Sequence, residues 1–158
     1  MDCLLEDVDF EKVKMIVLPG GMPGTTNLEA CAPLMEQVEK FYEHSIAMVQ
    51  AGGFDIIGHF DKIGDNASHF SPGIEDEPWY QSLVNELIDN IIAANPIVEI
   101  NTKVYANRGR LFPSERYWDR LISADIDIIL SSDAHVPALI DASLETVAEM
   151  LRKHRITI

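Results

Sequence analysis

The chain has 158 residues, of which 47% are apolar and 24% charged, and its formal net charge is −14. This length matches the prior of about 150 residues for one domain, and the composition is that of a globular protein rather than a disordered or fibrous one. A surface this acidic repels nucleic-acid phosphates and anionic lipid headgroups, so neither nucleic acid nor a membrane is expected as a partner.

The cysteines and apolar runs indicate a cytoplasmic protein. Cys3 and Cys31 are too few for a disulfide framework, which favours a reducing compartment. The apolar runs are shorter than the ~20 residues that a bilayer requires. Acidic residues follow Met1, where a signal peptide carries basic ones.

Four short runs rich in β-branched residues predict strands, at 15–18, 54–60, 96–102 and 126–132. Nearly continuous apolar runs are typical of parallel strands that are covered on both faces. Residues 3–5 are a weaker candidate for a further strand, and residues 155–158 either add a last strand or fray.

Helical patterns lie between these runs. Apolar residues recur at spacings of three and four over 33–50 and 79–94. Pro78 suits a helix start, and Pro96 ends the second pattern. A shorter helical pattern follows Ser114, and another begins after Asp141. Either Asp141 or Ser143 can cap this last helix.

This alternation predicts a single α/β domain with a parallel sheet of four or five strands and right-handed helical crossovers. Two architectures fit the pattern, a partial TIM-like barrel and a flavodoxin-like open sheet. The longest irregular stretch is 61–78, and connections of this length are often functional.

The carboxyl ends of the predicted strands carry the best candidates for a metal site, because ligand sites in α/β sheets form there. His59 follows the second strand, and Asp133 and His135 follow the fourth. Residues two apart in an extended segment point the same way, so Asp133 and His135 can face one cation. Imidazole and carboxylate suit zinc, manganese or iron. The alternative is a hydrogen-bonded His59 at a strand end and an Asp133 that caps a turn.

Two segments offer anion-binding groups. Backbone amides of Gly20 and Gly21 follow the first predicted strand, and Arg108 and Arg110 form a basic cluster near Ser114. Amides and guanidinium groups both suit phosphate, which makes these residues candidates for substrate binding. The alternative is a turn at the glycines and a solvated loop with a helix cap at the arginines.

Glu99 and Cys31 are weaker candidates. Glu99 alternates with apolar residues, and it either faces solvent, pairs with Lys103, or supports a metal ligand. Cys31 falls near a predicted helix start, which lowers the pKa of a thiol. No histidine is close to it in the sequence, so it is not a convincing nucleophile.

Four spaced segments carry a resemblance to a known family. They are DIIGHFD at 55–61, VEINT at 98–102, LFPSE at 111–115 and SSDAH at 131–135. Over about 35–156, some three quarters of the chain, the sequence resembles the PHP family (polymerase and histidinol phosphatase) in its histidinol-phosphatase-like branch. These enzymes are distorted (β/α) barrels that hydrolyse phosphate monoesters at a trinuclear metal site. The resemblance implies that His59, Asp133 and His135 are metal ligands and that Arg108 and Arg110 contact phosphate.

A second resemblance covers about 2–39. It rests on LLEDVDF at 4–10 and MIVLPGGMPGTTNL at 15–28. These segments are similar to the PfpI and Parkinsonism-protein family, which has a flavodoxin-like fold. There, amides equivalent to those of Gly20 and Gly21 lie beside a reactive cysteine on a strand-to-helix elbow. This chain has no such elbow, and Cys31 is not at that position.

Together the resemblances indicate an engineered or recombined chimera, PfpI-like over about 1–38 and similar to the C-terminal half of a PHP barrel over about 39–158. The alternative is a natural gene that has been truncated and rearranged. The PHP family's N-terminal His-x-His pair and bridging glutamate have no counterparts here. By resemblance, His59, Asp133 and His135 serve different metals, each left with fewer than the about three protein ligands of a catalytic site.

The implied function is therefore a metal-dependent phosphoesterase of histidinol-phosphatase type, incomplete and impaired, whose substrate is a phosphorylated small molecule. One alternative is a chimeric α/β scaffold without native activity, in which a half-barrel pairs as a homodimer. The other is a PfpI-like deglycase or chaperone.

Overall fold

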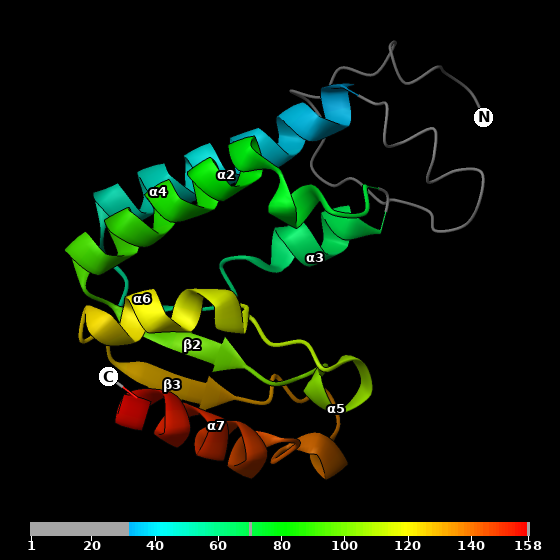
Figure 1. Cartoon of the computed structure of the whole chain (residues 1–158), viewed down its shortest axis with the longest axis vertical. Coiled ribbons are helices and arrows are strands. Elements are labelled where there is room, and N and C mark those ends of the chain that lie inside the picture. Colours follow the sequence, from blue (N-terminus) through cyan, green and yellow to red (C-terminus); the bar gives the residue numbers. More distant parts are fainter. Residues whose placement is uncertain (1–31, 70, 158) are drawn as a thin grey trace.

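The computed structural model describes residues 32–69 and 71–157 (Figure 1). In chain order the elements are α2 (Ala32–Ala51), β1 (Ile56–Ile57), α3 (Lys62–Ser68), η3 (Ile74–Asp76), α4 (Pro78–Ala94), β2 (Ile97–Asn101), α5 (Tyr105–Arg108), η4 (Glu115–Tyr117), α6 (Trp118–Ser123), β3 (Ile128–Ser131), η5 (Pro137–Leu139) and α7 (Leu144–Thr157). The α/β class is confirmed. The strand candidates at 3–5 and 15–18, together with Gly20, Gly21 and Cys31, lie outside the described residues.

The described strands form one parallel sheet in the order β1-β2-β3. Ile56 of β1 is opposite Ile97 of β2, and β2 pairs with β3 from Val98 opposite Ile128 onward. Three of the four main predicted runs are therefore strands, so the described part of the sheet has three strands rather than four or five. β1 is shorter than the predicted 54–60, and His59, two residues beyond its end, has left-handed backbone geometry (φ 34°).

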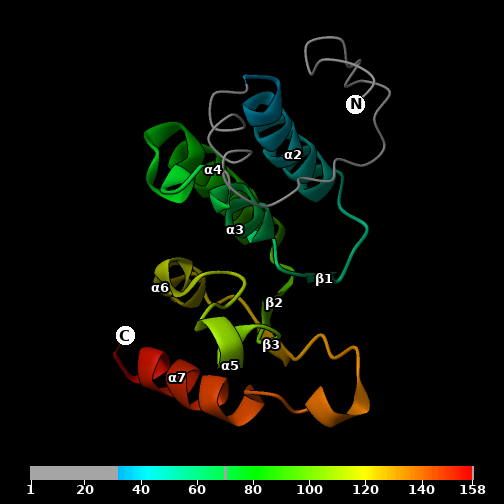
Figure 2. The same cartoon turned by 90° about the vertical axis from the view of Figure 1, so that its right-hand side faces the viewer.

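Only one face of this sheet is covered by described residues, which corrects the prediction of burial on both faces. Val98 and Ile100 are buried among residues of α4, α6 and α7. On the opposite face, Ile56 and Ile129 are 50% and 44% exposed. Figure 2 shows α4, α6 and α7 along one side of the strands.

Helices α2 and α4 pack side by side and run in the same direction (Figure 1). The hydroxyl groups of Tyr42 and Tyr80 form a buried 2.6 Å hydrogen bond, and Gln50 donates one to Asn90 further along both helices. The helices predicted over 33–50 and 79–94 are confirmed to within two residues at each end. Their apolar stripes face each other and form the larger of two core clusters.

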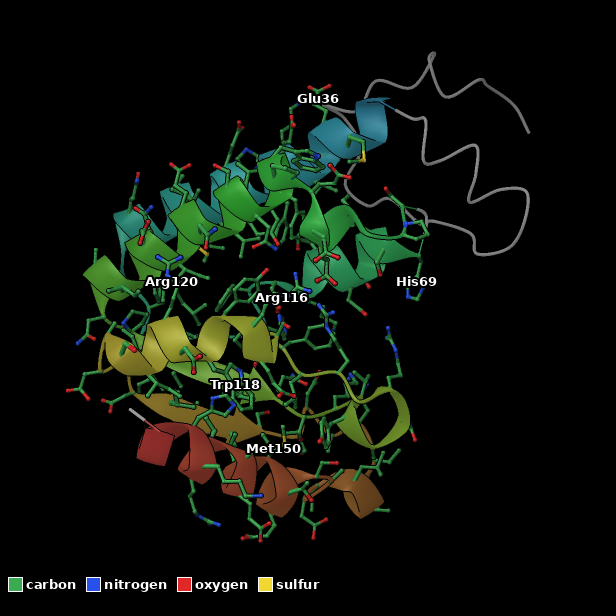
Figure 3. The ribbon with its side chains drawn as sticks, in the orientation of Figure 1. Glu36, His69, Arg116, Trp118, Arg120 and Met150 are labelled. Carbon is green, nitrogen blue, oxygen red and sulfur yellow. The ribbon has the colours of Figure 1, made fainter. Side chains whose placement is uncertain are left out.

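The smaller core cluster joins α6 and the sheet to α7. Trp118 is fully buried in it, and Met150 of α7 packs against its edge (Figure 3). On the other side of α6, Arg120 donates hydrogen bonds to Asn85 and Asp89 of α4. Helix α6 therefore links the two clusters.

The stretch 61–78 is not the irregular loop that its composition predicts. It contains α3 and the short η3, and Gly73 supplies the left-handed backbone (φ 88°) that precedes η3. Gly64 in α3 lies against the hydroxyl of Tyr80, where a Cβ atom would overlap it. At the other end of the chain, residues 155–157 continue α7, so the alternative of a last strand there is wrong.

Candidate functional site

Asp133, His135 and Lys103 meet at the carboxyl end of the sheet. His135 Nε2 lies 3.2 Å from Asp133 Oδ1. The Lys103 ammonium lies 3.1 Å from Asp133 Oδ2 and 2.8 Å from His135 Nε2. Lys103 follows β2, and the other two residues follow β3, so two neighbouring strands of the sheet supply this cluster.

Local backbone geometry places these side chains. The N–H of Asp133 donates a 3.1 Å hydrogen bond to Ser131 Oγ, and the N–H of Lys103 donates one of the same length to Asn101 Oδ1. Asp133 has φ 46°, a left-handed geometry that aspartate tolerates better than most residues. Partial burial raises the pKa of Asp133, but hydrogen bonds from Lys103 and Asn101 outweigh that effect and hold the pKa below its usual value.

His59 is not part of this cluster. Its side chain is exposed, and in the ranges 32–69 and 71–157 no three His, Cys, Asp or Glu side chains are arranged to hold a metal ion. The structure therefore brings Asp133 and His135 together but does not add His59 to them. A catalytic metal centre takes about three protein ligands, so the described residues do not fit one, and an ammonium group already contacts both remaining donors.

The arginines expected to contact phosphate are instead paired with carboxylates. Arg108 forms a bidentate pair with Asp65, in which its two terminal nitrogens donate hydrogen bonds of 3.0 and 2.6 Å to the carboxylate oxygens. Arg110 makes the same kind of contact with Glu75, at 2.8 and 2.5 Å. Both carboxylates are largely buried and need a cationic partner to offset their lost hydration, which explains why the arginines turn toward them.

Asp61 is the most deeply buried carboxylate of this region, with 0% of its surface exposed. Its Oδ2 accepts a 2.7 Å hydrogen bond from the backbone N–H of Ser114 and lies 4.0 Å from Arg110. Ser114 thus contributes its backbone to a buried network. Burial raises the pKa of Asp61 to about 6, although Ser114 and Arg110 both act to lower it.

The sequence offered only a weak signal for Asp61. The residue follows a predicted strand, but nothing in the local pattern separates it from other acidic residues. Its partners Ser114 and Arg110 come from the segment between α5 and η4, so its role depends on contacts that only the folded chain creates.

Glu99 lies on the central strand β2 and is half-buried. A Cβ atom on Gly58 would lie 2.7 Å from Glu99 Oε2, so the glycine permits a close approach between β1 and this carboxylate. The predicted pairing of Glu99 with Lys103 is not what the structure shows, because Lys103 pairs with Asp133.

No protein-family model and no curated protein sequence matches the chain. The resemblances to the PHP and PfpI families therefore stay predictions. Among the described helices, none combines the length and apolar character needed to cross a bilayer.

Proposed function

We propose that this protein is a metal-dependent phosphoesterase of PHP type in impaired form, with a phosphorylated small molecule as its substrate. The observation that supports this proposal best is the 3.2 Å contact between Asp133 and His135 at the carboxyl end of the sheet. Asp133 and His135 are the two residues of the SSDAH segment to which the PHP resemblance assigns metal binding.

The strand order fits a partial TIM-like barrel. Strands β1, β2 and β3 are adjacent in chain order. Right-handed crossovers that advance in one direction place their helices on the same face, as in a (β/α) barrel. A flavodoxin-like sheet reverses its strand order at a switch point and carries helices on both faces. Within the described strands no such reversal occurs, which fits a barrel and also fits the strands on one side of a flavodoxin-like switch point.

The same site explains why activity is expected to be low. Asp133 and His135 provide two donors where a tight zinc, manganese or iron site uses about three or four. Arg108 and Arg110, the implied phosphate contacts, are already neutralised by Asp65 and Glu75. We therefore expect weak metal binding and slow turnover.

A phosphatase assay tests the proposal. Hydrolysis of p-nitrophenyl phosphate is measured with Mn²⁺ or Zn²⁺ for the wild-type protein, His135→Ala and the control His44→Ala. His44 is exposed on α2, away from the carboxyl end of the sheet. We expect a slow metal-dependent rate that His135→Ala loses and His44→Ala keeps. Equal rates for the wild type and His135→Ala would overturn the proposal.

A specific observation favours one second candidate, an α/β scaffold without native activity. Lys103 contacts both metal-donor side chains, and Arg108 and Arg110 are both paired with carboxylates. This candidate is supported if no variant or metal changes the rate of phosphate-ester hydrolysis above the buffer background.

A further inference from the structure

We propose that the Lys103 ammonium occupies the cation position between Asp133 and His135, so that any divalent metal must displace it. This inference rests on the proposed function, which assigns metal binding to Asp133 and His135. It identifies Lys103 as the group that regulates access of a metal to that pair. The ammonium lies 3.1 Å from Asp133 Oδ2 and 2.8 Å from His135 Nε2, so one cation contacts both donors.

The hydrogen-bonding chemistry of the three groups allows the ammonium to bridge the two other side chains. An ammonium group has donors and no acceptor, so the nitrogen of His135 that faces it must offer a lone pair. With the imidazole proton on Nδ1, Nε2 accepts from the ammonium, and its 3.2 Å contact with Asp133 Oδ1 then joins two acceptors that share one cation. His135 Nε2 and the carboxylate of Asp133 then present lone pairs to the same cation, as they would to a metal ion.

A metal ion and the ammonium cannot share this position. Zinc binds imidazole nitrogen and carboxylate oxygen at about 2.0–2.2 Å, so the two donors would have to close around the metal where the Lys103 Nζ now lies. Even at the dielectric constant of water, repulsion between a single and a double positive charge about 6 Å apart corresponds to about 10-fold in affinity.

The position of Lys103 in the fold keeps its ammonium close to the pair. Lys103 follows β2, the central strand, and its backbone N–H is held by Asn101 Oδ1. Its side chain is 31% exposed, against 71% for His135. The ammonium therefore reaches the pair from the neighbouring strand, on a side chain that is less exposed than that of His135.

Zinc affinity measured by isothermal titration calorimetry on the tag-free full chain tests this inference. We expect Lys103→Met to bind Zn²⁺ about 10-fold more tightly than the wild type. Lys103→Arg, which keeps the charge, and Lys62→Met, which removes a charge elsewhere, should both bind as the wild type does. Adding His135→Ala to Lys103→Met should abolish the gain. Far-ultraviolet circular dichroism checks that each variant is folded.

Each outcome decides the inference. It is overturned if Lys103→Met and the wild type bind Zn²⁺ equally, if neither binds it, or if the gain survives His135→Ala. The phosphatase assay separates this from the proposed function. A Lys103→Met protein that binds Zn²⁺ about 10-fold more tightly than the wild type without hydrolysing p-nitrophenyl phosphate would end the phosphoesterase proposal and leave the role of Lys103 standing.

Discussion

The backbone N–H of Ser114 donates a 2.7 Å hydrogen bond to Oδ2 of Asp61, which lies 53 residues earlier in the chain. The bond joins the segment that follows β1 to the segment between β2 and β3. Arg110 strengthens the same junction, because its guanidinium contacts Glu75 directly and lies 4.0 Å from Asp61. Two successive strand–helix units are thus tied together by a buried polar network.

Asp61 should make the stability of the protein depend on pH. Burial raises its pKa to about 6 from 3.8, so the folded chain binds this proton more tightly than the unfolded chain does. Its contribution to stability is therefore greatest below the unfolded pKa, falls as pH rises from about 4 to about 6, and stays low above that. A shift of about two units corresponds to about 3 kcal/mol.

Urea denaturation of the wild type and Asp61→Asn across this pH range measures the effect. Asparagine keeps an oxygen that can accept the Ser114 hydrogen bond and removes the titration. We expect the stability of the wild type, relative to that of Asp61→Asn, to fall by about 3 kcal/mol between pH ~4 and ~8. Parallel stability curves for the two proteins would show that Asp61 does not titrate in this way.

Arg110→Gln should cost more stability than Arg116→Gln. The Arg110 and Glu75 side chains are 22% and 13% exposed, and removing the guanidinium leaves buried charge on Glu75 and Asp61, at about 2–4 kcal/mol. The Arg116–Asp76 pair is 41% and 75% exposed, and a pair of this kind contributes about 0–1 kcal/mol. Chemical denaturation compares the two variants, and similar losses would argue against the buried network.

Gly64→Ala should destabilise the protein although alanine favours helices. The added Cβ would overlap the hydroxyl of Tyr80, which the Tyr42 hydroxyl holds in place, so we expect a loss of about 1–3 kcal/mol. Gly58→Ala is the matched control, because its Cβ meets only the mobile end of Glu99. Thermal and urea denaturation should show a clearly smaller loss for Gly58→Ala. A neutral Gly64→Ala would mean that the contact with Tyr80 relaxes freely.

The sheet face that the described residues leave uncovered predicts self-association. Ile56 and Ile129 are half-exposed there, and exposed apolar strands tend to pair with a second copy of the chain. We expect sedimentation or light scattering to show a mass that rises with concentration and falls back in Ile129→Thr. Ile140→Thr, at a residue that is 70% exposed beyond the sheet, should associate as the wild type does. A strict monomer at every concentration would remove the homodimer from consideration.

Long periodic segments were predicted well from the sequence. The helices over 33–50 and 79–94 were placed correctly because each has a continuous apolar stripe and packs on the other. Helix α3 was missed because it has seven residues, with Gly64 at its centre, and its position depends on contact with Tyr80. Local pattern carries no information about such a contact.

The candidate site was predicted only in part for a similar reason. Asp133 and His135 do lie 3.2 Å apart, but the reason differs from the predicted extended segment, because Asp133 has left-handed backbone geometry (φ 46°). The spacing gave no information on Lys103, which reaches them from the neighbouring strand, or on the carboxylates that pair with Arg108 and Arg110. Those partners lie between 30 and 43 residues away in the chain. A local sequence pattern does not predict contacts over such a separation.

In a sheet ordered as β1-β2-β3, every hydrogen-bonded ladder joins strands that are also consecutive along the chain. A break between two units of such a sheet therefore severs one ladder and leaves the others whole. Exchange of whole strand–helix units between genes is less disruptive in this arrangement than in sheets whose strands interleave. The described strands thus form a set that can accept a different leading segment without reorganising their own pairing.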